Sequence, residues 1–255
     1  MMKKYLIDLT LTSVEWLTDR HVLMKLTHDE ALPEALPGQF VEVRIDNEPS
    51  TFLRRPISIN NIDRARNELW LLVAAIGNGT RRLTKLKAGE KVNCLFPLGN
   101  TFKVQEGSLL VGGGVGMAPM FFLGKVMVEQ GLVPSFLLGA RTASDVLLLD
   151  EFRKLGLVYV TTEDGSMGEK GFVTNHSILK EKSFGSIATC GPKPMMMAVA
   201  RYAKAHGIAC EASLENMMAC GLGACLCCVE KTVRGNLCVC KDGPVFNIDE
   251  LLWQI

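Results

Sequence analysis

The sequence predicts an N-terminal antiparallel β-barrel, a central α/β domain with a parallel sheet, and a small C-terminal metal-binding domain. Three observations support this. Short apolar segments with frequent turn signals fill residues 1 to about 100, strands alternate with helices from about residue 104, and six of the nine cysteines lie between residues 220 and 240. We expect domains at residues 1–103, 104–206 and 207–255.

The first hundred residues contain strand-like segments separated by the turn sequences PG, DNEPS, NN, GNG and KAGE. Evenly spaced short strands of this kind are typical of a sandwich or small barrel. One short helical turn is expected at 80–86. The expected strands are residues 5–12, 20–27, 39–45, 56–61, 69–76 and 91–95.

From residue 104 each strand is followed by a helix or turn, which predicts crossover helices on a parallel sheet. Residues 207–255 show one short strand at 210–213 and otherwise little regular pattern. The expected strands are 108–111, 133–138, 157–162 and 187–189, and the expected helices are 119–129, 145–156 and about 192–206, with a turn and helix in 171–182.

Composition narrows the function classes. The 255 residues are 48% hydrophobic and 22% charged, and 28 basic against 27 acidic residues give a net charge of +1. This balance lacks the basic face that nucleic-acid binding needs. The sequence shows no apolar run of membrane-spanning length and no signal-peptide core, so we expect a cytoplasmic protein without membrane attachment. Its cysteines are then expected to be reduced, and metal-binding or catalytic before disulfide-bonded.

Two glycine-containing loops follow strands of the α/β domain. GGGVGMAPM begins at Gly112, where backbone N–H groups could approach a pyrophosphate. It departs from G-x-G-x-x-G, because Met117 or Pro119 stands at the third glycine position. CGPKPMM begins at Cys190 and would face the same crevice. The alternative is a pair of tight turns without a ligand, and Cys190 is expected to be a small buried thiol more than a group beside a nicotinamide.

The barrel contains the segment RRPISI, residues 54–59, and the loop GNGT, residues 77–80. Arginine can pair bidentately with phosphate, and a serine hydroxyl can bond a polar ring edge. The alternatives are a solvated arginine pair at a strand edge and an ordinary hairpin turn.

The cysteine spacing is the most specific signal. Cys220, Cys225 and Cys228 have the C-x4-C-x2-C spacing of plant-type [2Fe–2S] proteins, and Gly221 and Gly223 allow the unusual φ angles of a cluster loop. Cys238 and Cys240 are both candidates for the fourth ligand. Structural zinc is the alternative, but zinc sites usually use paired C-x2-C knuckles. Cys227 is expected to be a small filler, because neighbouring residues do not readily bind one cluster.

Together, RRPISI, GNGT, PLGNTF, GARTASDVLLLDEF, SLENMMACGLGAC and CKDGPVFN resemble a branch of the ferredoxin–NADP reductase superfamily, the electron-transfer subunits of NAD-dependent dihydroorotate dehydrogenase. The resemblance covers nearly the whole chain. It departs at Phe96, Thr101 and Cys227, where this family is expected to have glycine. It implies FAD, one [2Fe–2S] cluster, NAD, and a separate FMN-containing catalytic subunit in a heterotetramer of two of each.

The resemblance also implies site residues and prefers Cys240 over Cys238. Arg55 would lie near the flavin phosphates and Ser58 near its ring. The implied flavin residues are Arg55, Pro56, Ile57, Ser58, Leu72, Val73, Ala74, Gly79 and Thr80. The implied nicotinamide residues are Gly113, Gly114, Gly116, Gly191 and Pro192, and the implied cluster ligands are Cys220, Cys225, Cys228 and Cys240.

The implied function is electron transfer between the partner's FMN, which oxidises dihydroorotate to orotate in pyrimidine biosynthesis, the cluster, FAD and NAD⁺. No residue is assigned to acid–base catalysis, since the four histidines are scattered and expected at the surface. The alternatives are a subunit of a ferredoxin-dependent NAD(P)H transhydrogenase or a sulfide dehydrogenase, and a non-catalytic redox- or zinc-binding regulator. Arg141, after the second strand of the α/β domain, leaves NADP possible.

Overall fold

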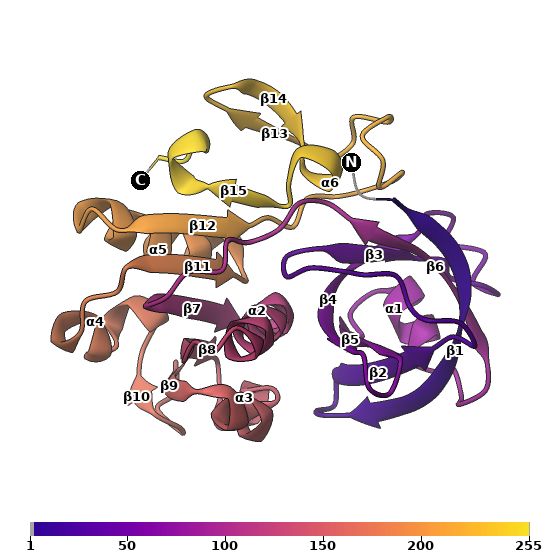
Figure 1. Ribbon diagram of the computed structural model, residues 1–255, viewed down its shortest axis with the longest axis horizontal. Helices are drawn as coiled ribbons and strands as arrows, with labels where there is room; N and C mark the ends of the chain where they lie inside the picture. The colour runs from indigo at the N-terminus through magenta and orange to yellow at the C-terminus, as the bar shows by residue number, and fades with distance from the viewer. Residues whose placement is uncertain (1–2, 255) are drawn as a thin grey trace.

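The structure is a computed structural model that describes residues 3–254 as a closed barrel, a seven-stranded sheet and a two-stranded hairpin (Figure 1). This arrangement confirms the predicted fold class. The barrel lies on the right of Figure 1, the sheet on the left, and the C-terminal segment across the top of both.

The barrel has six antiparallel strands in the order β1-β2-β5-β4-β3-β6. Its interior is apolar because alternate strand residues point inward, as Leu9 and Leu11 do at 0% exposure. All six expected strands form, and so does the short helix. The elements are β1 (Tyr5–Trp16), β2 (His21–Thr27), β3 (Phe40–Val43), β4 (Arg55–Asp63), β5 (Glu68–Ala74), α1 (Asn78–Leu83) and β6 (Lys91–Leu98).

The second sheet has the order β10-β9-β8-β7-β11-β12-β15, and only β15 runs antiparallel to its neighbour. Two of its strands come after residue 206, so the C-terminal segment completes the sheet. The domain boundaries remain a prediction. The strands are β7 (Ser108–Gly113), β8 (Ser135–Ala140), β9 (Leu157–Thr162), β10 (Glu169–Lys170), β11 (Ser186–Cys190), β12 (Ala209–Ser213) and β15 (Val245–Asn247), and the hairpin is β13 (Val229–Thr232) with β14 (Gly235–Cys238).

Helices cover both faces of this sheet. Leu109 and Val111 of β7 pack into the core that holds α5, whereas Leu110 packs into the core that holds α2 and α3. The helix expected at 145–156 is shorter, because Leu148 has a φ of 55° and the helix starts after it. The helices are α2 (Met117–Glu129), α3 (Leu149–Leu155), α4 (Ile178–Glu181), α5 (Lys193–Ala205) and α6 (Val239–Asp242), with 3₁₀ turns η1 (Gly114–Gly116), η2 (Ala143–Asp145), η3 (Val173–Asn175) and η4 (Ile248–Glu250).

Helix α2 joins the two halves of the molecule. Phe121 packs into the core of the sheet, and the next residue, Phe122, packs into the core of the barrel. The helix therefore lies between β7 and β4, and the loop before it is held where the barrel and the sheet meet.

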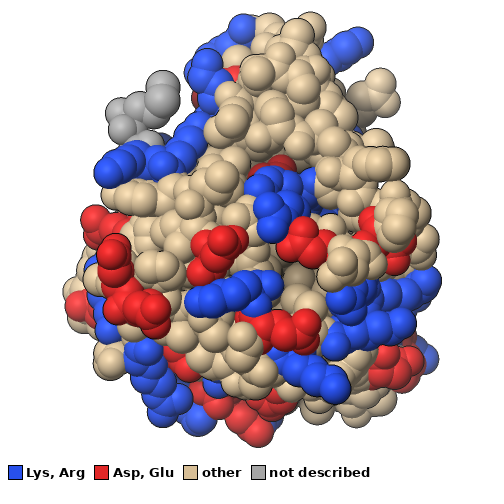
Figure 2. Space-filling view, turned by 90° about the vertical axis from the view of Figure 1, so that its right-hand side faces the viewer, with Lys and Arg blue, Asp and Glu red and all other residues tan. Residues whose placement is uncertain are grey.

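The charged residues show no face of a single sign on the barrel side of the molecule (Figure 2). Acidic and basic side chains are intermixed there, and the upper part has an uncharged centre with basic side chains along its edges. Across residues 3–254, no helix combines the length and apolar character needed to cross a membrane.

Candidate functional site

The first cavity lies between the barrel and the segment after β12 and has a volume of about 360 Å³. That volume is within the range of small-molecule and cofactor sites. The structure brings seven of the nine residues expected at the flavin to this one cavity, although their binding role stays a prediction. They are Pro56, Ile57, Ser58, Leu72, Val73, Ala74 and Thr80.

Arg55 and Gly79, the other two, lie against each other outside the lining of this cavity. A Cβ atom at Gly79 would be 3.1 Å from Arg55 Nε and 3.0 Å from Thr51 Cγ2, so only glycine fits there without displacing a neighbour. A guanidinium next to a glycine-containing loop suits phosphate. Arg54 differs, because its guanidinium donates to Asn93 Oδ1 at 2.5 Å and to the Glu42 carbonyl at 3.2 Å and so joins β3 to β6.

Sequence reasoning missed more than half of this cavity's lining, ten of its seventeen residues. Its far wall comes from the segment after β12 and from Pro244, which follows the last cysteine. These two parts of the chain come together only when the protein folds. Glu215 in this wall is exposed to solvent, and the protein atoms gathered around its carboxyl raise the pKa of that group. The missed residues are Phe40, Ile76, Val115, Ser213, Leu214, Glu215, Asn216, Met217, Met218 and Pro244.

The second cavity, of about 540 Å³, lies at the carboxyl ends of the parallel strands. Gly113, Gly114 and Pro192 line it as expected, and Gly114 has a φ of 56° with open space at its Cβ position. Gly116 and Gly191 do not line it. A Cβ at Gly116 would be 2.3 Å from the Cys190 carbonyl, so this glycine lets the two loops pack together.

The barrel also contributes to this second cavity through Arg20, His21 and Ile76. Arg20 Nη2 pairs with Asp145 Oδ1 at 2.7 Å across the boundary between barrel and sheet. Ile76 lines both cavities, so ligands bound in the two would adjoin. Arg141 and Glu163 lie in the same lining, so both signs of charge border it.

Two histidine expectations were wrong. His21 is only 7% exposed and His176 only 9%, whereas the sequence placed all four histidines at the surface. The His176 Nδ1 atom accepts the Ile178 N–H at 3.0 Å, which gives that ring a structural role. Cys190 is a buried thiol, 1% exposed, and its burial raises its pKa.

All nine cysteines are free thiols. The pKa of the Cys220 thiol is affected by Cys225 and that of Cys240 by Cys228, so the four predicted cluster ligands are neighbours in two pairs, and the Cys240 N–H also donates to Cys228 Sγ at 3.3 Å. In residues 3–254 no three His, Cys, Asp or Glu side chains are close enough to hold one metal ion. Two thiol pairs fit a two-iron cluster, in which each iron takes two protein thiolates beside two bridging sulfides.

Backbone N–H groups point at these sulfurs, as a cluster site requires. Leu222 N donates to Cys220 Sγ at 3.3 Å, and Gly223 N donates to Cys240 Sγ at 3.2 Å. Desolvation raises the pKa of Cys220, but N–H groups of residues 222, 224 and 225 outweigh it and lower this pKa to about 6. The loop needs glycine, since φ is 65° at Gly221 and 80° at Gly223.

The two remaining cysteines of the group lie on opposite sides of it. Cys227 is exposed, whereas Cys238 is 7% exposed and its thiol lies 3.9 Å from the Gly223 carbonyl.

Below the loop lies Glu42 of β3, with 0% exposure and no hydrogen-bond partner for either carboxyl oxygen. Burial raises the pKa of Glu42 to about 7. A Cβ at Gly221 would be 2.8 Å from Glu42 Cγ, so the loop packs directly on this carboxyl side chain.

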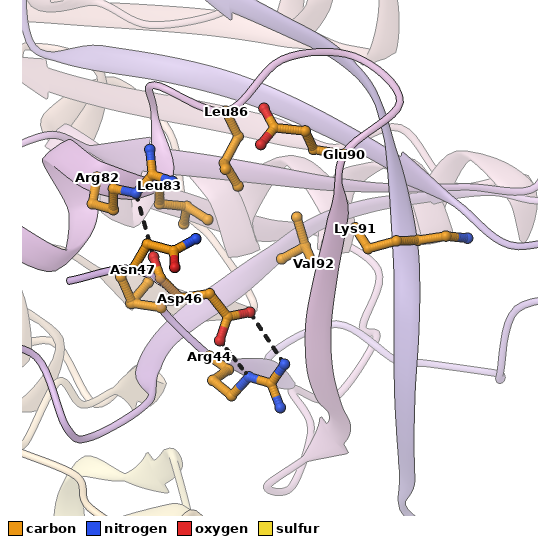
Figure 3. A pocket seen from close by; sticks show the side chains of 10 residues that line it. Arg44, Asp46, Asn47, Arg82, Leu83, Leu86, Glu90, Lys91 and Val92 are labelled. Carbon is orange, nitrogen blue, oxygen red and sulfur yellow. Dashed lines mark hydrogen bonds and ion pairs between the residues drawn. The ribbon is translucent and has the colours of Figure 1, made fainter. Parts of the chain in front are cut away.

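A third hollow, of about 200 Å³, lies at the outer end of the barrel beside α1 (Figure 3). None of the predicted site residues lines it. Its Arg44 is held by Asp46 at 2.8 Å, Arg82 donates to the Asp46 carbonyl, and Lys91 points away from the hollow. These groups already satisfy one another, so we assign no ligand to it.

Comparison with known proteins bears on the flavin cavity, the nucleotide cavity and the cysteine group. Residues 215–252 match the family described as the iron–sulfur cluster binding domain of dihydroorotate dehydrogenase B, and residues 110–201 match the oxidoreductase NAD-binding domain. The dihydroorotate dehydrogenase B (NAD(+)) electron transfer subunit of Shouchella clausii is 40% identical over 226 residues, 85% of this chain and 86% of that one. The chain belongs to the dihydroorotate dehydrogenase B electron-transfer subunit family.

Other comparisons agree with this membership. The same subunit of Bacillus velezensis is 38% identical over 251 residues, 95% of this chain and 97% of that one. A solved structure of an NADH-dependent reduced ferredoxin–NADP oxidoreductase aligns with a TM-score of 0.86 and 28% identity, over 96% of this chain and 90% of that one. The chain is an oxidoreductase subunit for electron transfer with FAD, a [2Fe–2S] cluster and NAD as cofactors, and it works with a catalytic subunit.

Proposed function

We propose that this chain passes electrons between NAD and an FMN-containing dihydroorotate dehydrogenase subunit, in a cytoplasmic heterotetramer of two chains of each kind. The net reaction would be dihydroorotate + NAD⁺ → orotate + NADH + H⁺. Support comes from the relatives, which are named as electron transfer subunits of dihydroorotate dehydrogenase B.

The observation that carries the proposal is that three candidate sites lie in series. Ile76 lines both the nucleotide cavity and the flavin cavity, and Pro244 of the flavin cavity follows Cys240 by four residues. A bound flavin supplies the exchange between a two-electron hydride and single electrons. Such an exchange needs the flavin between the nucleotide, which gives or takes a hydride, and the cysteine group, which would carry single electrons. The three sites have this order.

Individual residues take their roles in this proposal from their positions. Arg55 and Gly79 hold the flavin phosphates, and Ser58 and the β5 residues Leu72 to Ala74 border its ring. Gly113, Gly114 and Pro192 hold the nicotinamide nucleotide, with Gly116 and Gly191 shaping the loops around it. Cys220, Cys225, Cys228 and Cys240 hold the cluster.

The catalytic subunit docks, in this proposal, on the exposed end of the cysteine loop. Leu222 and Leu226 are 45% and 65% exposed there, and Cys225 is exposed beside them. Exposed apolar side chains next to a redox group favour a protein interface over solvent.

A second candidate function is a ferredoxin-dependent NAD(P)H transhydrogenase subunit. The similarity to the NADH-dependent reduced ferredoxin–NADP oxidoreductase structure favours it, at 28% identity. The curated relatives at 38% to 40% identity favour the dihydroorotate-linked function.

Co-expression with the dihydroorotate dehydrogenase of the same genome tests the proposal. We expect the two chains to co-purify and to reduce NAD⁺ when dihydroorotate is added. A Cys228→Ser variant should lose this reaction while NADH still reduces its flavin. NADPH oxidation that depends on ferredoxin, with no response to dihydroorotate, would support the second candidate.

A further inference from the structure

Asn100, just after β6, uses its backbone and its side chain to hold the segment that follows the last cysteine. Its N–H donates to the Gly243 carbonyl at 2.6 Å. Its Nδ2 donates to the carbonyls of Asp242 at 3.0 Å and Val245 at 2.8 Å, and its Oδ1 accepts the Val245 N–H at 2.9 Å. All four hydrogen bonds go to one four-residue segment, although about 140 residues of chain separate the partners.

The preceding residue presses against the same segment. Gly99 has a φ of 82°, and a Cβ there would be 2.5 Å from Pro244 Cδ and 3.1 Å from a ring atom of Phe40. Pro244 and Phe40 both line the flavin cavity. The end of β6 therefore fixes one wall of that cavity through direct packing.

The other end of the segment reaches the cysteine group. Asp242 Oδ2 accepts the Cys238 N–H at 2.8 Å, and Cys240 lies two residues before Asp242. The Cys240 N–H in turn donates to Cys228 Sγ at 3.3 Å. A short rigid connection thus runs from the cysteine pair through Asp242 and Gly243 to Pro244 in the flavin cavity.

We infer that Asn100 is a positioning residue for electron transfer, because it fixes the cysteine group relative to the flavin cavity. The inference rests on the part of the proposed function that places these two sites in series, and not on the identity of the partner. In the NADH-driven direction the balance is NADH + FMN + H⁺ → NAD⁺ + FMNH₂, and the two electrons pass this connection one at a time. Asn100 is not among the residues that line either cavity and has no hydrogen bond to a thiol, so it acts through residues 242–245.

An isosteric Asn100→Asp substitution tests this inference. It places a carboxylate oxygen against the carbonyls of Asp242 and Val245, so both Nδ2 bonds are lost. We expect NADH to reduce the flavin at the wild-type rate in stopped-flow absorbance. Reduction of the iron–sulfur cluster, followed by freeze-quench electron paramagnetic resonance of the holoprotein, should slow roughly 10- to 100-fold, as is typical when outer residues of a metal site are removed.

Asn67 provides a matched control. It is half-buried like Asn100, donates to two carbonyls at 2.8 and 2.9 Å, and accepts the Leu32 N–H at 2.8 Å. These bonds join barrel turns that line none of the cavities described above. Asn67→Asp should therefore lose comparable stability without slowing cluster reduction. If Asn100→Asp is obtained without cofactors, Asn100→Ser removes most of the same bonds without adding charge.

A readout that does not depend on activity completes the test. Amide hydrogen exchange should accelerate at Gly243 and Val245 in the Asn100 variants and stay unchanged there in Asn67→Asp. Equal slowing of cluster reduction in both variants would overturn the inference, and so would faster exchange at Gly243 and Val245 with an unchanged reduction rate. Because no partner is present, failure of dihydroorotate-linked NAD⁺ reduction would count against the proposed function alone.

Discussion

At the scale of single residues, Cys238 and Cys240 are the two candidates for the fourth cluster ligand, and they contact different groups of Gly223, Cys240 the N–H and Cys238 the carbonyl. Cys240 Sγ accepts the Gly223 N–H at 3.2 Å, and the Cys240 N–H donates to Cys228 Sγ at 3.3 Å, so Cys240 lies among the other predicted cluster ligands with a backbone donor at its sulfur. Cys238 instead faces the Gly223 carbonyl, a neighbour that repels a thiolate and suits a protonated thiol.

This difference predicts opposite results for two serine variants. Cys240→Ser should lose most of its iron and its visible iron–sulfur absorption, whereas Cys238→Ser and Cys227→Ser should keep both. Iron content and absorbance after anaerobic purification check the prediction, with flavin content as the measure of intact folding. Loss of iron in Cys238→Ser but not in Cys240→Ser would reverse the ligand assignment.

His21 predicts how stability responds to pH. Burial and the nearby Arg20 lower its pKa below the ordinary value of 6.5. Thr18 Oγ1 already accepts the N–H groups of Arg20 and His21, so its own proton points to His21 Nδ1, which requires a neutral ring. As pH falls below about 6.5, the unfolded chain binds more protons at this site than the folded one, so stability falls.

Urea unfolding at pH 7.5 and pH 5.5 measures this effect. The free energy of unfolding should fall more on acidification in the wild type than in His21→Asn, whose amide oxygen can accept the Thr18 proton at any pH. Equal acid sensitivity in both proteins would assign the effect to other groups.

At the scale of elements, local sequence patterns predicted the strands well, since β-barrel strands alternate and each turn carries Gly, Pro or Asn. The elements that the sequence analysis did not predict are β10, β13, β14, α6 and β15. Cysteine and glycine spacing dominates residues 219–243 and hides alternation there. β12 and β15 complete the sheet through long-range pairing, which no local pattern reports.

The same reasoning explains the candidate sites. Pro56, Ile57, Ser58 and the β5 residues stand on strands that the sequence located, and the family resemblance, not the strand pattern, implied that they border one ligand. The opposite wall, from Ser213 to Met218 and at Pro244, arrives through tertiary packing. His21 was misplaced because a histidine in a polar turn carries no local sign of burial.

Helix α2 predicts how strongly the barrel and the sheet depend on each other. Phe122 is 4% exposed and is the buried residue of α2 that packs in the barrel core. Truncation to alanine should cost about 3–5 kcal/mol of unfolding free energy. Circular dichroism and flavin release in urea should shift together, because the helix belongs to both cores. Val128→Ala, at a position 41% exposed on the same helix, should shift either midpoint very little.

At the scale of the whole molecule, the two redox ends face different surroundings. The nucleotide cavity is bordered by Arg20, Arg141, Asp145 and Glu163, which suits a charged and soluble ligand. The cysteine loop presents exposed apolar side chains instead, while the net charge of the chain is only +1. Long-range electrostatic attraction of a protein partner is therefore weak, and affinity must come from apolar contact.

Leu226 gives the sharpest test of whether the partner binds through apolar contact at the cysteine loop. It is 65% exposed with a φ of 57°, a conformation that costs leucine about 1–2 kcal/mol but that asparagine adopts readily. Leu226→Asn should therefore keep or slightly raise the thermal stability of the free subunit, while weakening binding to the catalytic subunit roughly tenfold if Leu226 is an interface anchor. Calorimetry at low and high salt should give nearly the same affinity loss. Val133→Asn, 71% exposed between α2 and β8, should leave binding unchanged. Unchanged affinity in Leu226→Asn, or an equal loss in Val133→Asn, would place the docking surface elsewhere.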